Sequence, residues 1–130
     1  MKLFNFIFKG KTRLAILSEY GIIDVEKAAQ EASIDVPTTI EEVILRGEKA
    51  LLELSQLIKP NALTLKGEIT YAPAVTKPEK IICVGLNYIS HTSETKADIP
   101  TFPVLFSKFN NSLASHNQSI SIPSSAKDGL

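Results

Sequence analysis

The residues that most constrain the fold form an unbroken apolar run, Ile81 to Gly85 (IICVG). A strand-length run without alternation is typical of a β-strand that is covered on both faces. About 50 residues follow the Lys-Pro-Glu-Lys linker at 77–80, and a mixed sheet of that size does not cover its own faces. The sequence therefore predicts a strand that depends on other layers and a C-terminal unit that is incomplete.

The composition is that of a globular protein. Hydrophobic residues make up 44% and charged residues 22% of the 130 residues, which argues against a disordered, collagen-like or membrane-bundle chain. Fourteen basic residues balance fourteen acidic residues, so no basic field attracts nucleic acid or anionic lipid. We expect a small-molecule or protein partner, with no nucleic acid and no membrane.

The cellular location is inferred from the cysteine content and the N-terminus. The single cysteine, Cys83, excludes an internal disulfide and fits a reducing compartment. Met1 to Phe8 begins like a signal peptide, but the apolar run stops at Lys9 without a cleavage site. No stretch approaches the roughly 18 apolar residues of a membrane span. These features predict a cytoplasmic protein.

Residues 1–76 are expected to form a small α+β domain. Apolar and aromatic runs separated by turns predict an antiparallel β-meander, over residues 3–8, 13–17 and 22–25, and a short helix is expected over 25–32.

A second, longer helix is predicted from its N-terminal signature. Thr39-Ile40-Glu41-Glu42 fits the capping box, in which two side chains satisfy unpaired backbone N–H groups. After it, an apolar stripe at helical spacing continues to Pro60 and comprises Ile44, Leu51, Leu54 and Ile58.

Residues 77–130 are assigned to a second unit. Besides 80–85, two more segments are predicted as strands, 104–109 and 119–123, and the loops between them are rich in Asn, Ser and Pro. The chain then stops at 127–130 without a closing helix or strand, so the unit is expected to be truncated.

The densest group of reactive side chains follows the apolar run, between Gly85 and Glu94. If residues 89–96 form a short helix, His91 and Glu94 share one face at a spacing of three. A carboxylate beside an imidazole orients it and favours its protonation, as a general base acting on water requires. The same spacing also fits a solvated pair on an exposed helix.

Other reactive residues have plainer interpretations. Lys108 fits an outward lysine on an edge strand, Asn87 fits a turn, and His116 fits a loop. With two His and one Cys, no zinc constellation is available. The sequence after the linker also lacks a phosphate-cradling glycine loop, and a Cys83 thiol within an apolar strand would be inert.

Two ordered motifs carry a resemblance to a known family. The segment 80–94 (KIICVGLNYISHTSE), followed by 103–108 (PVLFSK), resembles the opening of the catalytic domain of the fumarylacetoacetate hydrolase family. The preceding residues resemble the small N-terminal domain of many bacterial members. The resemblance therefore covers essentially the whole chain.

The resemblance implies a mixed β-rich catalytic fold, often dimeric, with Mg²⁺ or Mn²⁺ as the cofactor. It implies a catabolic enzyme acting on 1,3-dicarbonyl or 2-oxo acid substrates such as acylpyruvates, whose relatives include C–C hydrolases, decarboxylases, isomerases and dehydratases. By position, His91 resembles the general base, Glu94 its partner and Lys108 the active-site lysine. The positions expected to shape the substrate pocket are Gly85, Asn87 and Tyr88.

One part of the family pattern is missing. The family's metal is held by carboxylates, including a Glu-x-Glu pair, that follow the point at which this chain stops. Asp98 and Asp128 do not replace that pair, and Mg²⁺ needs at least one or two placed carboxylates. We therefore expect no metal ligands in this chain and no metal held by the chain alone.

Three interpretations remain open. The leading one is the N-terminal domain and the start of the catalytic domain of a metal-dependent hydrolase that cleaves a C–C bond. The second is an inactive remnant or interaction module. The third is a chain that acts only with a separate C-terminal portion, so its partner is either a second copy in a homodimer or that missing portion.

Overall fold

The computed structural model describes residues 1–88 and 100–126. Contacts divide these residues into two compact units: Met1–Val75 with the segment that starts at Ala114, and the described part of Thr76–Leu113. The strands and three α-helices confirm the predicted α+β class. The assignment of residues 1–76 and 77–130 to two functional domains stays a prediction.

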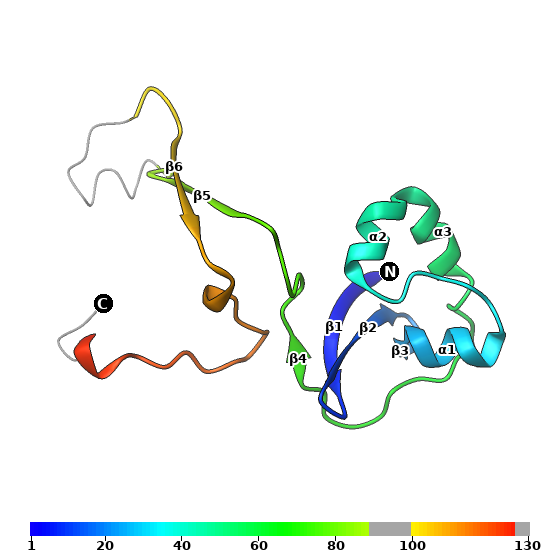
Figure 1. Cartoon of the computed structure of the whole chain (residues 1–130). Coiled ribbons are helices and arrows are strands. Elements are labelled where there is room, and N and C mark those ends of the chain that lie inside the picture. Colours follow the sequence, from blue (N-terminus) through cyan, green and yellow to red (C-terminus); the bar gives the residue numbers. More distant parts are fainter. Residues whose placement is uncertain (89–99, 127–130) are drawn as a thin grey trace. The chain divides into compact units, whose positions relative to one another are not determined.

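The first unit is built on an antiparallel meander, as predicted (Figure 1). Strands β1 (Lys2–Phe8), β2 (Lys11–Ser18) and β3 (Gly21–Asp24) pair in succession. Lys9 and Gly10 join β1 to β2 with φ values of 49° and 75°. Two residues with positive φ match the right-handed twist of the strands that they connect, which explains the tight turn.

A distant segment completes this sheet. β4 (Tyr71–Ala72) pairs with β1, so the strand order is β3-β2-β1-β4. The buried side chain of Asn5 donates through Nδ2 to the carbonyl oxygens of Pro73 and Ala74, both at 3.0 Å. These bonds satisfy a buried amide and attach the chain after β4 to the sheet.

Helix α1 (Val25–Ala32) has the predicted bounds and begins directly after β3. Its N-cap, Asp24, accepts a hydrogen bond from the backbone N–H of Lys27 at 3.3 Å. The same Oδ1 lies 2.8 Å from Nη2 of Arg13. Asp24 therefore joins the helix start to the adjacent strand β2.

The long second helix predicted after Thr39 is instead two short helices. α2 (Ile40–Arg46) ends at Gly47, whose φ of 59° and ψ of −133° are accessible mainly to glycine, and α3 (Glu48–Ser55) follows. The predicted capping box is confirmed: Oγ1 of Thr39 accepts from the N–H of Glu42 at 3.2 Å, and Oε2 of Glu42 accepts from the N–H of Thr38 at 2.7 Å.

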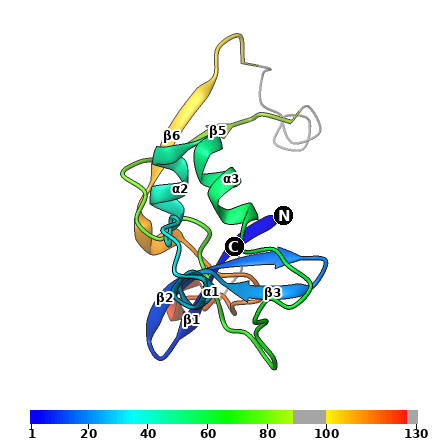
Figure 2. The same ribbon diagram turned by 90° about the vertical axis from the view of Figure 1, so that its right-hand side faces the viewer.

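The break at Gly47 changes which residues face the core. Leu54 is fully buried, but Ile44 and Leu51 are exposed, so the predicted single stripe is wrong for its first two members. The three helices pack on one side of the meander (Figure 2). Their common core comprises Leu14, Ile16, Ile23, Val25, Ala28, Ala29, Val36, Val43, Ala50, Leu54 and Leu57.

The second unit contains an antiparallel ribbon of two strands, β5 (Ile81–Gly85) and β6 (Val104–Lys108). Both strands were predicted, but burial of the first on both faces was not borne out: Ile82 is 63% exposed. The physical reason is that two strands alone supply no covering layer.

The C-terminal segment differs from expectation in one respect. Residues 119–123, predicted as a strand, have no strand structure and are followed by a 3₁₀ turn, η2 (Ser124–Ala126). Another 3₁₀ turn, η1 (Asn110–Ser112), follows β6. Among the helices that the structure describes, none has the length and apolarity needed to cross a membrane.

Candidate functional site

The predicted pocket residues lie at one end of the β5–β6 ribbon. Gly85 is the last residue of β5, and Asn87 and Tyr88 follow it directly. Tyr88 is 72% exposed. The structure therefore presents these three positions together, at a strand end where backbone groups are open to a ligand.

The backbone turns sharply at this strand end. Leu86 has a φ of 51°, in the left-handed region that non-glycine residues seldom adopt and that is enriched at functional sites. A methyl group at Gly85 would lie 3.6 Å from Phe106 and from Val104, which is ordinary contact. The described residues thus provide room for a larger residue at Gly85.

Lys108 lies at the other end of the ribbon. In the antiparallel register Gly85 pairs with Val104, whereas Lys108 pairs with Ile81. Four residues at about 3.3 Å each separate the two positions by about 13 Å along the strands. The ribbon therefore puts Lys108 and Gly85 on the same face but does not bring them together.

The two residues predicted to act as the catalytic pair, His91 and Glu94, lie outside the described residues, as does the helix expected over 89–96. Their assignment stays a prediction from the resemblance. The other histidine, His116, lies in a turn as expected. Its ring meets that of Tyr71 edge-on, with centroids 5.0 Å apart.

The metal ion that the resemblance implies would need several oxygen or nitrogen donors close together. Within 1–88 and 100–126, no group of three or more His, Cys, Asp or Glu side chains is arranged to hold a metal ion. The described residues therefore do not fit the Mg²⁺ or Mn²⁺ that the resemblance implies.

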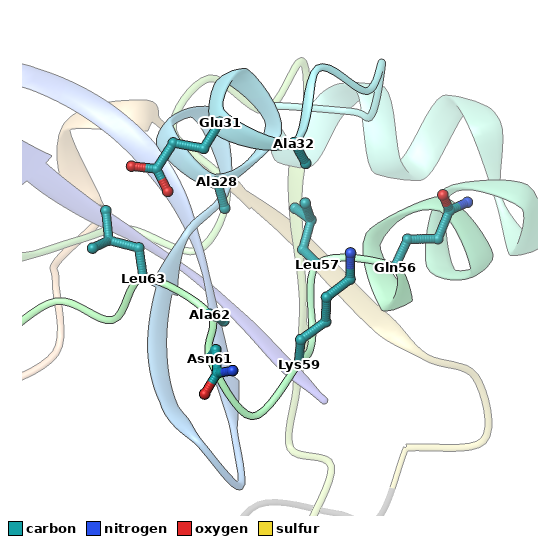
Figure 3. A pocket seen from close by; sticks show the side chains of 9 residues that line it. All are labelled: Ala28, Glu31, Ala32, Gln56, Leu57, Lys59, Asn61, Ala62 and Leu63. Atoms are coloured by element: carbon teal, nitrogen blue, oxygen red, sulfur yellow. The ribbon is translucent and has the colours of Figure 1, made fainter.

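The first unit contains a cavity of about 210 Å³ between α1, the end of α3 and the chain that follows it (Figure 3). Most of its lining residues are apolar, and Glu31 and Lys59 are its charged ones. None of the predicted site residues lines it. The lining residues are Ala28, Glu31, Ala32, Gln56, Leu57, Lys59, Asn61, Ala62 and Leu63.

Sequence reasoning missed a second cavity, of about 460 Å³, in the same unit. Phe4 and Tyr71 form part of its wall, with ring centroids 5.3 Å apart, and His116 borders it. These residues come from segments far apart in the chain, so no local pattern could have identified them.

Comparison with known proteins identifies the family. Residues 80–129 match the family model described as fumarylacetoacetate hydrolase C-terminal. This stretch begins one residue before β5 and includes the whole ribbon. It also contains all six predicted site positions.

Curated relatives extend the match beyond that stretch. The mitochondrial oxaloacetate tautomerase Fahd2a of Rattus norvegicus is 35% identical over 72% of this chain and 30% of its own length. The mitochondrial oxaloacetate tautomerase FAHD2A of Bos taurus is 30% identical over 83% of this chain and 33% of its own. The fumarylacetoacetate hydrolase domain-containing protein 2 homolog of Dictyostelium discoideum is 32% identical over 85% of this chain and 36% of its own length.

These comparisons agree with each other and with the motif. The chain spans about a third of the length of the curated relatives that it matches. The family model matches the segment that contains the ribbon and the motif after it, and the relatives match most of the chain. The chain belongs to the fumarylacetoacetate hydrolase family.

Proposed function

We propose that this chain supplies part of the active site of an enzyme that interconverts the keto and enol forms of a 2-oxo acid of the oxaloacetate type. The observation that carries the proposal is the match to relatives named oxaloacetate tautomerase. It is supported by the placement of Gly85, Asn87 and Tyr88 at one open strand end.

The chemistry requires one proton to move. In the keto form a C–H bond next to the carbonyl breaks, its electron pair forms the C=C bond, and the carbonyl oxygen gains a proton. His91 is proposed as the base that takes the carbon-bound proton, and Glu94 as the carboxylate that orients the imidazole. A cation such as Lys108 would stabilise negative charge on the oxygen, although β5 and β6 alone do not place it beside Gly85.

Gly85 offers a second line of support. Since a methyl group fits there without a close contact, the fold of the ribbon does not demand glycine. Close approach of a substrate to the backbone would demand it. Gly85→Ala is therefore expected to preserve the ribbon and to weaken substrate binding.

The test is a chimera in which residues 80–129 of this chain replace the matching stretch of the rat oxaloacetate tautomerase. Ultraviolet absorbance of the enol follows the conversion of oxaloacetate, with and without added Mg²⁺. We expect the chimera to accelerate the conversion. His91→Ala should lower the rate by about 10²-fold to 10⁴-fold, the contribution of a positioned general base.

His116→Ala is the matched control, because His116 is the only other histidine and lies in a turn outside the motif. It should leave the rate unchanged. If both alanine variants behave alike, His91 is not the base. A folded chimera without tautomerase activity would contradict the proposed reaction.

A second candidate reaction is the hydrolysis of a C–C bond in an acylpyruvate or another 1,3-dicarbonyl compound. The family description, which names a hydrolase, favours it. Here the same base would deprotonate water, water would attack one carbonyl, and the other half would leave as an enolate. Loss of the 1,3-dicarbonyl absorbance in the same chimera distinguishes cleavage from tautomerisation.

The metal cofactor, the alternative of an inactive remnant and the cellular location are further proposals. Mg²⁺ or Mn²⁺ as cofactor is supported by the family alone, and the assay with and without Mg²⁺ tests it. An inactive remnant is the outcome if neither reaction is accelerated. The relatives are named as mitochondrial proteins, whereas a cytoplasmic location for this chain is proposed from its cysteine content. Fractionation of source cells decides between the two locations.

A further inference from the structure

The sheet of the first unit has a face that points away from the core shared with the helices, called here the outer face. Side chains alternate between the two faces of a strand. Ile16 and Ile23 are fully buried in the core. Their neighbours Leu17 and Ile22 therefore lie on the outer face. Leu17 pairs with Ile22 on β3 and with Lys2 on β1, so these three residues form one cross-strand row.

Two aromatic side chains lie beside this row. Phe4 comes two residues after Lys2 on β1 and so lies on the same face. Tyr71 lies on β4, the strand that pairs with β1. The ring centroids of Phe4 and Tyr71 are 5.3 Å apart, at an interplanar angle of 50°. The outer face therefore offers a tilted pair of rings next to an apolar cross-strand row.

The row and the rings line the second cavity of the first unit, whose volume is about 460 Å³. Sites for small molecules have volumes of about 300–1,000 Å³ and are lined mainly by apolar and aromatic side chains. A cavity of about 150 Å³ is enough for benzene. This cavity therefore has room for two fused rings with a small substituent.

The lining of this cavity carries its charge at one position. Lys2 is the only Lys, Arg, Asp or Glu among the residues that line it. Within the described residues, its ammonium group has no ion-pair partner. An unpaired cation at the border of an apolar cavity favours an anionic ligand. A single lysine matches the single charge of a carboxylate, whereas a phosphate is usually held by several donors.

We propose that this cavity binds an aromatic carboxylate of one or two rings. The ring system lies against Phe4 and Tyr71 and over the apolar row, and the carboxylate pairs with Lys2. Packing of aromatic rings adds to the binding energy beyond the buried area, so the site favours an aromatic ring over a saturated ring of the same size. The inference does not rest on the proposed reaction, because none of the six predicted site positions lines the cavity.

The test titrates the full 130-residue chain with 2-naphthoate, followed by isothermal titration calorimetry at low salt. Two analogues separate the two contributions to binding. Decahydro-2-naphthoate keeps the carboxylate but has no aromatic ring, and 2-naphthamide keeps the rings but has no charge. We expect one 2-naphthoate to bind per chain, and each analogue to bind about threefold or more weakly. This comparison needs no variant of the protein.

Lys2→Met tests the pairing with the carboxylate. It should weaken binding of 2-naphthoate about threefold to fivefold and leave binding of the uncharged 2-naphthamide unchanged. Salt at about 1 M should weaken binding of 2-naphthoate to the wild-type chain by a similar factor. Lys11→Met is the matched control, because Lys11 is also exposed at the end of a strand but does not line the cavity.

Phe4→Leu tests the aromatic contact. It should weaken binding of 2-naphthoate about threefold to tenfold and change binding of the saturated analogue less. Phe8→Leu is the matched control, because Phe8 lies on the same strand and outside the cavity. Tyr71→Phe keeps the second ring and should bind 2-naphthoate like the wild-type chain. Circular dichroism of each variant checks that the first unit is folded.

Three results would overturn the proposal: no saturable binding of 2-naphthoate, equal affinities for 2-naphthoate and its saturated analogue, or equal effects of Lys2→Met and Lys11→Met. Size-exclusion chromatography tests for another occupant. A chain that is dimeric without ligand and becomes monomeric on Phe4→Leu uses this surface to bind a second copy, which would also overturn the proposal.

Discussion

The strands of the first unit and those of the β5–β6 ribbon differ in how far their apolar residues are buried, although they belong to one chain. In the first unit three helices share a buried core with strands β2 and β3 of the sheet. In the ribbon, two strands of similar apolar content have every residue partly or wholly exposed. The comparison shows that apolar sequence forms strands locally, whereas burial needs a second layer.

The largest loss of stability is expected from a cavity in the core of the first unit, because that core is where this unit differs from the ribbon. Leu54 is 0% exposed, so Leu54→Ala removes buried methyl groups and leaves a cavity. We expect the free energy of unfolding to fall by about 3 kcal/mol. Urea denaturation followed by circular dichroism measures it. A loss similar to that of a ribbon residue would show that the first unit is no better packed.

The next largest effect is expected at the junction of β2, β3 and α1. Asp24→Ala removes both the N-cap acceptor for Lys27 and one of the two carboxylate partners of Arg13, 2.8 Å away. We expect a loss of about 1–2 kcal/mol, since a cap contributes about 1 kcal/mol and Arg13 keeps the carboxylate of Glu26, 3.1 Å away. Asp24→Asn is the control: it keeps a cap acceptor and should lose less in the same denaturation experiment.

A substitution at Gly47, between α2 and α3, tests how much the backbone conformation there contributes to stability. Nothing lies within 4 Å of a methyl group added at Gly47, but its φ of 59° disfavours any side chain. Gly47→Ala should therefore cost about 1–2 kcal/mol through backbone strain alone. Lys49→Ala, at an exposed position of α3, should cost less than 0.5 kcal/mol. Thermal unfolding of both variants compares the two effects.

A smaller effect is expected at the start of α2. Thr39→Ala removes the oxygen that accepts from the N–H of Glu42, at a cost of about 1 kcal/mol. Thr38→Ala is matched to it, because Thr38 takes part through its backbone N–H, which the substitution keeps. Equal midpoints in urea for the two variants would contradict the role of the Thr39 side chain.

The smallest effect is expected in the ribbon. Leu105 is 62% exposed on β6, so Leu105→Asp should change the free energy of unfolding of the first unit by less than about 0.5 kcal/mol. The same denaturation experiment measures it. A loss comparable with that of Leu54→Ala would show that the ribbon shares the core of the first unit.

The local features of the fold could be predicted because they depend on neighbouring residues. The alternating runs predicted β1 to β3, the turn residues predicted their connections, and Thr39 and Glu42 predicted a capped helix start. The single helix predicted after Thr39 was wrong because the prediction followed the apolar spacing and took no account of Gly47. Glycine at positive φ ends a helix regardless of the stripe around it.

The candidate site was predicted by motif and only partly placed by the structure. Gly85, Asn87 and Tyr88 form one strand end, and Lys108 lies at the opposite end of the ribbon. A motif gives the order of residues, but their separation follows from strand direction and register. Those depend on which strands pair, which the motif alone does not state.

The sequence by itself determined the family, the positions of the first three strands and of β5 and β6, and the capped start of α2. Tertiary structure decided that β4 pairs with β1, that Tyr71 meets His116, and that β5 pairs with β6 in the register that separates Lys108 from Gly85. The physical reason is the separation in sequence between the residues that interact. Backbone conformation and capping depend on a few neighbouring residues, whereas pairing and burial depend on segments that only the folded chain brings together.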